Sequence, residues 1–139
     1  MKRVARVFLA VFAISSAVPG NCLSVQDLYS AMNLINEGKY SEAVALLESS
    51  PDSPERDLSL GIAFLHLGRY GDAEKWLNRV IEVLPGSLPA RYSLAMLYEN
   101  RKDFKKAIKQ WDKVLSLTDS DALRDLALKH IKTLERMKE

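Results

Sequence analysis

Leu60-Gly61-x-x-Phe64 opens the stretch that decides the fold of this chain, and Gly68-x-Tyr70-x-x-Ala73-x-x-x-Leu77 continues it. The same pattern returns 34 residues later as Leu94-Ala95-x-x-Tyr98 and Phe104-x-x-Ala107-x-x-x-Trp111. Small residues stand at matching places in both copies, and so do large apolar ones. A fixed period of this length is typical of repeat proteins, in which each unit packs on its neighbours.

Each copy predicts two amphipathic helices joined by a tight turn, because its apolar residues recur three and four positions apart. Gly61 and Ala95 are small where the two helices of a copy meet, so we expect close approach there, with Leu77 packed between the helices. Gly68 favours the left-handed backbone that ends a helix. Pro85 ends the second helix, because proline cannot continue a helix interior.

A weaker copy lies upstream, as Ala31-x-x-Leu34 and Gly38-x-Tyr40-x-x-Ala43-x-x-x-Leu47. Its offset to the next copy is 30 residues, so about one helical turn is missing before Pro51. Asp52 or Ser53 is expected to cap the helix that follows. Downstream, one further helix is predicted from Asp121 to Lys138, with its buried side formed by Leu123, Leu126, Ala127, Ile131 and Leu134.

These copies resemble the tetratricopeptide repeat, a helix-turn-helix unit that stacks into a superhelix. The resemblance implies an all-α fold: a right-handed α-α superhelix (solenoid) of three helix pairs with a C-terminal capping helix. The chain departs from the family pattern at several positions. A frequent tryptophan is replaced by Asp27, Asp57 and Arg91, Lys102 stands where glycine is usual, and Asp119 replaces the closing proline of repeat 3. We divide the chain into a leader (1–21), a short degenerate repeat 1 (24–53), repeat 2 (54–87), repeat 3 (88–120) and the capping helix (121–139).

The leader has the three parts of a secretory signal, or of a lipoprotein signal. Basic residues from Met1 to Arg6 precede an apolar stretch from Val7 to Val18, and small or turn-forming residues follow. About a dozen apolar residues are too few to span a bilayer, which needs about 20. We therefore expect export, either to the periplasm or to the surface of a membrane.

Cys22 is the single cysteine, so an intramolecular disulfide is excluded. It stands directly after the leader, where a bacterial lipoprotein carries its lipid. The preceding Pro19-Gly20-Asn21 departs from the usual lipobox, however. Two outcomes stay open: a lipid anchor at Cys22, or cleavage after Gly20 or Ala17 and release into the periplasm. No other membrane attachment is expected.

The chain has 20 basic and 18 acidic side chains, and loss of Lys2, Arg3 and Arg6 with the leader leaves 17 against 18. This balance argues against a nucleic-acid partner, which requires a basic footprint. One basic surface is predicted on the second helix of repeat 3. We interpret it first as a solvated face, with an anionic lipid or an acidic partner as the alternatives. This lysine stripe comprises Lys102, Lys105, Lys106, Lys109 and Lys113.

Catalytic motifs are lacking in the sequence, so we expect a protein that is not an enzyme and has no cofactor or metal. His66 and His130 are the only histidines, and neither has a nearby ligand partner at metal-site spacing. There is no glycine-rich phosphate loop, no nucleophile elbow and no second cysteine. The carboxylates form no paired set and are scattered over polar positions, as Glu42, Glu48, Glu55, Glu74 and Glu82.

The resemblance implies a concave groove lined by the first helices of the repeats. Most of its lining is apolar, which argues against the cationic clamp by which chaperone-binding relatives hold a terminal carboxylate. We predict that it binds a helix or an extended segment of another protein; self-association and simple core filling are the alternatives. The predicted lining is Leu28, Met32, Ile35, Leu58, Ile62, Leu65, His66, Tyr92, Met96, Glu99 and Asn100.

Two functions follow from such a groove. The first is an adaptor in the cell envelope that holds a partner protein. The second is a carrier of a hydrophobic small molecule or lipid, acting as an accessory to a transporter. An open trough favours the adaptor, and a closed pocket that surrounds a ligand favours the carrier.

Overall fold

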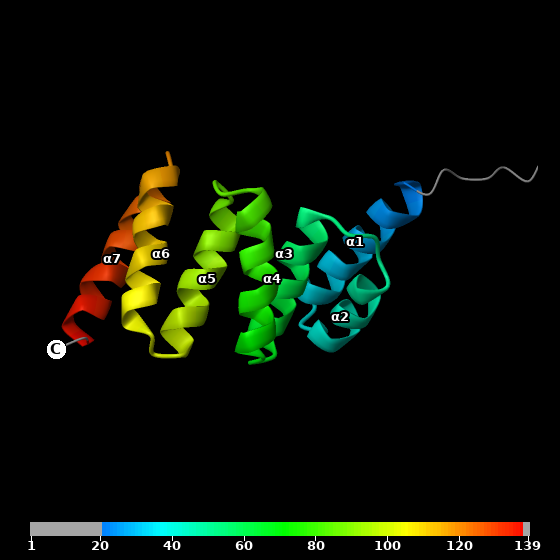
Figure 1. The fold of residues 1–139 in the computed structure, drawn as a ribbon, viewed down its shortest axis with the longest axis horizontal. Coiled ribbons are helices and arrows are strands. Elements are labelled where there is room, and N and C mark those ends of the chain that lie inside the picture. The colour runs from blue at the N-terminus through cyan, green and yellow to red at the C-terminus, as the bar shows by residue number, and fades with distance from the viewer. Residues whose placement is uncertain (1–20, 138–139) are drawn as a thin grey trace, which may run out of the picture.

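The computed structural model describes residues 21–137, and over that range it contains seven helices and no strand. Figure 1 shows the helices side by side along one axis, from α1 at one end to α7 at the other. This arrangement confirms the predicted all-α helical-repeat solenoid. The helices are α1 (Asn21–Asn36), α2 (Tyr40–Glu48), α3 (Pro54–His66), α4 (Tyr70–Val83), α5 (Leu88–Asn100), α6 (Phe104–Leu117) and α7 (Asp121–Met137).

The predicted leader lies outside the described residues, except for Asn21, which begins α1. Cys22 follows in the first turn of that helix. The missing turn of the first copy is found in α2, which has 9 residues, whereas its counterpart α4 has 14. The 30-residue offset therefore comes from a shortened second helix.

A close contact in the core joins α3 to α4 at Gly61. A Cβ atom on Gly61 would stand 2.6 Å from Cγ of Leu77, closer than side chains can approach. Leu77 is fully buried, as predicted, and so is Ala95 at the equivalent place in α5. Close packing at these two small residues is what holds each helix pair together. The largest fully buried side chains are Phe64, Leu47, Leu60, Leu94, Leu97, Val80, Trp111 and Val114, besides Leu77.

The turns within the pairs use left-handed backbone. Gly38 has φ +76° and Gly68 has φ +72°, and Lys102 takes the same place in the third pair with φ +59°. Glycine adopts this conformation without steric cost, whereas a side chain costs about 1–2 kcal/mol there. Lys102 therefore holds a strained position that the two earlier repeats give to glycine.

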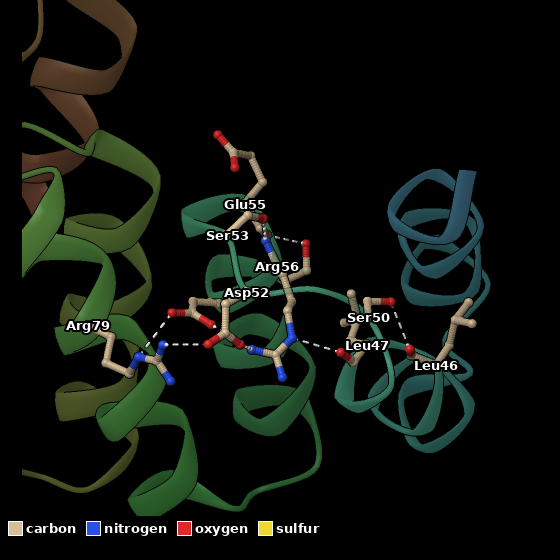
Figure 2. Close-up of polar contacts among 10 residues, drawn as sticks. Leu46, Leu47, Ser50, Asp52, Ser53, Glu55, Arg56 and Arg79 are labelled. Atoms are coloured by element: carbon tan, nitrogen blue, oxygen red, sulfur yellow. Dashed lines mark hydrogen bonds and ion pairs between the residues drawn. The ribbon is translucent and has the colours of Figure 1, made fainter. Parts of the chain in front are cut away.

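The junction between α2 and α3 is closed by polar contacts, which Figure 2 shows. Ser53 is the N-cap of α3, because its hydroxyl accepts a hydrogen bond from the backbone N–H of Arg56 at 3.1 Å. Asp52, the other predicted cap, instead pairs with the Arg56 guanidinium. The same guanidinium donates to the carbonyl of Leu47 in α2 at 2.8 Å. Arg56 thereby ties the first repeat to the second.

Asp57, at the position where the family often has tryptophan, is buried in this junction. Burial raises the pKa of its carboxyl, and the charges of Arg79 and Arg56 oppose that rise. Nε of Arg79 lies 3.1 Å from Oδ2 of Asp57. The guanidinium of Arg79 also lies over the ring of Trp76, 4.8 Å from its centroid. An ion pair of α3 with α4 therefore fills this position.

The Gly61 contact predicts that a larger residue there destabilises the fold. In Gly61→Val the side chain must displace Leu77, and we expect the free energy of unfolding to fall by about 2 kcal/mol in urea denaturation. Gly71→Ala in α4 is the control, because nothing lies within 4 Å of its added Cβ. That variant should be as stable as the parent or more so. Equal stability of the parent and Gly61→Val would contradict the packing described.

Candidate functional site

The first helices of successive pairs lie against one another, α1 on α3 and α3 on α5. The repeat offset places equivalent residues on each of these helices, so that Met32, Ile62 and Met96 occupy corresponding positions. The second helix of a pair packs on the opposite face of the first helix, so it does not cover these three residues. They form the walls of two hollows.

The first hollow lies between α1 and α3 and has a volume of about 620 Å³. Its side chains are mainly aliphatic, and Met32 is 51% exposed in its wall. The hollow is open to solvent along one side rather than enclosed. Glu55 is the one charged residue among those that line it. The full lining is Leu28, Met32, Ile35, Asn36, Glu55, Leu58, Ser59, Ile62 and His66.

The second hollow lies between α3 and α5 and also has a volume of about 620 Å³. It shares Ile62 and His66 with the first, so the two form one continuous groove. His66 stacks on Tyr40 with ring centroids 4.6 Å apart, which fixes the ridge between the hollows. The lining of the second hollow is Ile62, Leu65, His66, Gly68, Tyr70, Pro89, Tyr92, Ser93, Met96 and Asn100.

The structure thus brings ten of the eleven predicted groove residues into these two hollows, and Glu99 is the exception. No lysine or arginine lines either hollow in the described part of the chain. Such a surface can bury apolar side chains of a ligand, and it offers no cation for a terminal carboxylate. That a partner occupies it stays a prediction.

Comparison with protein families matches residues 34–87 to one tetratricopeptide repeat model and residues 88–121 to another. The chain belongs to the tetratricopeptide repeat family. Comparison with curated proteins found no match. Tetratricopeptide repeats in general indicate a scaffold for protein–protein interaction, and the family is typically non-enzymatic.

Glu99 of the tetratricopeptide repeat protein lies where α5, α6 and α7 meet. Its Oε1 accepts a hydrogen bond from Nε1 of Trp111 at 2.5 Å and lies 2.8 Å from Nδ1 of His130. The imidazole of His130 stacks on the fully buried indole of Trp111, with centroids 4.5 Å apart. A smaller hollow of about 180 Å³ beside these groups lies between α5 and α7. Glu99 therefore joins the capping helix to the last repeat.

Sequence reasoning missed this cluster, although a signal for it exists. His130 stands 34 residues after Met96, so the repeat offset carried into α7 places it next to the groove positions of α5. A similar link was missed between α4 and α5, where the hydroxyl of Tyr98 donates to Glu74 at 2.7 Å. Burial and this hydrogen bond raise the pKa of Tyr98 far above its usual range. Arg101 pairs with the other oxygen of Glu74.

Glu74 and Glu99 each join helices through side-chain hydrogen bonds. Within the described residues, no three His, Cys, Asp or Glu side chains are grouped closely enough to hold a metal ion. Among the helices of residues 21–137, none is long and apolar enough to cross a membrane. Glu74 accepts a hydrogen bond that links α4 to α5, and Glu99 contacts side chains of both α6 and α7.

The Glu99 cluster predicts a specific cost for losing the carboxylate. Glu99→Leu leaves the buried indole N–H of Trp111 without an acceptor, and we expect the free energy of unfolding to fall by about 2 kcal/mol. Glu99→Gln keeps an acceptor oxygen and should lose less than half as much. Urea denaturation followed by tryptophan fluorescence measures both variants. If the two variants lose equal stability, the hydrogen bond to Trp111 contributes nothing.

Proposed function

We propose that this chain is an adaptor of the cell envelope that holds an amphipathic helix of a partner protein in its groove. The observation that carries the proposal is the pair of hollows of equal size that share Ile62 and His66. A helix laid across α1, α3 and α5 can insert one apolar side chain into each hollow. Exposed apolar surface of this kind marks contact sites in soluble proteins.

The shape of the groove supports a polypeptide over a small ligand. Pockets for small molecules bury most of the ligand surface, typically 70–90%. Both hollows are open along one side, so a lipid or drug-sized carrier ligand would keep much of its apolar surface in water. A helix covers the open side with its own backbone and polar face. The carrier function is therefore the weaker alternative.

The residue types in the walls support a helix with aliphatic anchors. Met32 and Met96 are unbranched and flexible, so they adapt to the shape of an inserted side chain. Helical partners present anchors at intervals of three, four and seven residues. Neighbouring packed helices lie about 8–10 Å apart, which matches the rise of seven helical residues, about 10.5 Å. We therefore expect the two anchors to be seven residues apart.

The groove predicts that a charge in its wall abolishes partner binding while the fold survives. Ile62→Glu and Met96→Glu each place a carboxylate where an apolar side chain must dock, and its desolvation should weaken binding at least 100-fold. The measurements are affinity capture from envelope extracts, calorimetry with the purified captured protein, and sedimentation for self-association. Thermal melting should change by only a few degrees, since both positions are partly exposed.

Leu77→Glu is the matched control for the groove variants. Leu77 is fully buried between α3 and α4, so the same carboxylate there should cost several kcal/mol and unfold the repeat. If Ile62→Glu and Met96→Glu both melt as early as Leu77→Glu, the groove residues are core and the proposed function fails. Sedimentation that shows a dimer lost in both groove variants would identify a second copy as the occupant.

The envelope location rests on the composition of residues 1–21 and predicts processing. Protein recovered from the native host should lack Met1 to at least Ala17, and its intact mass measures this. A mass that begins at a lipid-modified Cys22 supports anchoring, and Cys22→Ser should then release the protein from membranes. A mass that begins at Val18 or Asn21 with a free thiol supports release into the periplasm. A retained leader contradicts export.

A further inference from the structure

Four residues of the lysine stripe lie on α6, and the fifth, Lys102, lies in the turn before it. Lys106 is at the edge of the stripe nearest the first helices, since its Nζ lies 5.2 Å from the centroid of the Tyr98 ring in α5. All five lysines are exposed. From Lys105 to Lys113 the stripe covers about 12 Å of helix, within an arc of about 100°. The stripe is therefore a narrow cationic surface on a second helix, whereas the groove is built by first helices. Both surfaces are accessible at the same time.

Exposure to solvent does not by itself require this much charge, as the equivalent helices of the same chain show. In α2 the positions that correspond to Lys105, Lys106, Lys109 and Lys113 are neutral or acidic, and in α4 they are of mixed character. The equivalents are Ser41, Glu42, Ala45 and Ser49 in α2, and Gly71, Asp72, Lys75 and Arg79 in α4. Only α6 among the three second helices has a cation at all four positions.

The charges of the stripe are also weakly neutralised. Lys106 pairs with Asp103 at 3.5 Å, and the other four lysines form no ion pair within the described residues. On α4, by contrast, Arg79 pairs with the buried Asp57. Unpaired cations close together repel one another, and this repulsion favours an external anionic surface.

Lys102 gives an independent observation. It extends the stripe by one cation at a left-handed backbone position, φ +59°, where the two earlier repeats have Gly38 and Gly68. A side chain at such a position strains the backbone, and strain of this kind is found at functional sites. Lys102 thus adds a charge to the stripe at the cost of backbone strain, and its ammonium makes no ion pair within the described residues.

We propose that the lysine stripe binds the surface of an anionic lipid bilayer. The stripe consists of lysines, which act as point charges, and has no arginine for the bidentate recognition of a single phosphate. None of the three hollows described above has a residue of α6 in its lining. A flat, diffuse anionic surface fits this pattern better than a shaped ligand does.

Exposed apolar residues beside the stripe support the same occupant. Leu117, on the last turn of α6, and Leu84, directly after α4, are 38% and 46% exposed. A Cβ atom on Gly86 would lie 3.9 Å from Leu117, so the ends of α4 and α6 lie close together. Apolar side chains next to lysines can enter the headgroup region while the lysines contact phosphates.

The test uses the full chain and two kinds of vesicle. One kind is pure phosphatidylcholine, and the other contains about 30% phosphatidylglycerol, which gives it an anionic surface. The readout is the difference in partitioning between the two vesicles, in which contact of residues 1–21 with neutral lipid cancels. Contact of Lys2, Arg3 and Arg6 with anionic lipid is the same in the parent and in each variant, so the comparison with variants isolates the stripe. Binding should be specific for the anionic vesicles and should weaken strongly between about 0.05 and 0.3 M salt. Equal binding to neutral vesicles, or none to either, overturns the proposal.

Variants locate the effect on α6. Each lysine near an anionic surface contributes about five-fold in partitioning, so the triple change Lys105→Gln, Lys109→Gln and Lys113→Gln should weaken it on the order of 100-fold. The same three positions changed to arginine should keep binding. The charge-matched control changes Lys39, Lys75 and Lys132 to Gln, three exposed lysines outside α6. If this control loses as much as the α6 variant, net charge and not the stripe is responsible.

Lys102→Gly separates lipid binding from stability. It relieves the left-handed strain and should raise the melting temperature, yet it removes a charge and should weaken anionic partitioning about five-fold. Unchanged partitioning in this variant removes Lys102 from the proposed surface. If soluble polyglutamate binds with the same lysine dependence and anionic vesicles do not, the stripe recognises an acidic polypeptide and the lipid proposal is wrong.

Discussion

The close approach of α3 to α4 at Gly61 is the constraint on which the rest of the structure depends. Leu77 fills the space that a Cβ on Gly61 would need, so the two helices of the pair are fixed in register. With each pair fixed, both of its helices pack on the first helix of the next pair, and the outer face of its second helix is left to solvent. The groove and the lysine stripe are both consequences of that division.

The helices, the turns and the core could be predicted from the sequence, because each depends on a residue and its neighbours within one repeat. Gly68 forms the turn after α3, and Leu77 is buried against α3. Both features depend only on residues within about sixteen positions along the chain. The groove lining was predictable to the same degree, since the repeat offset fixes which residues share a face. What occupies the groove depends on a partner that the sequence does not contain.

The polar clusters were not predicted, because each joins side chains from different helices. Glu99 lies at a groove position by its offset, but its long side chain reaches Trp111 and His130 on two other helices. Periodicity predicts which face of a helix a residue lies on. It does not predict which polar group of a neighbouring helix a charged side chain contacts. Asp57 shows the same limit, since its burial depends on Arg79 in the next helix.

The first helix of the solenoid differs from its equivalents in one residue that governs stacking. Ser59 and Ser93 are 7% and 6% exposed, because the preceding repeat covers them, and the repeat offset aligns both with Tyr29. Tyr29 is 63% exposed on α1. A contact that closely covers a serine is too tight for a phenol ring, so a unit that packed on α1 would need a different shape from the one that covers Ser59 or Ser93. Whatever packs on α1 must therefore do so differently, which separates that end of the molecule from the repeat interfaces within it.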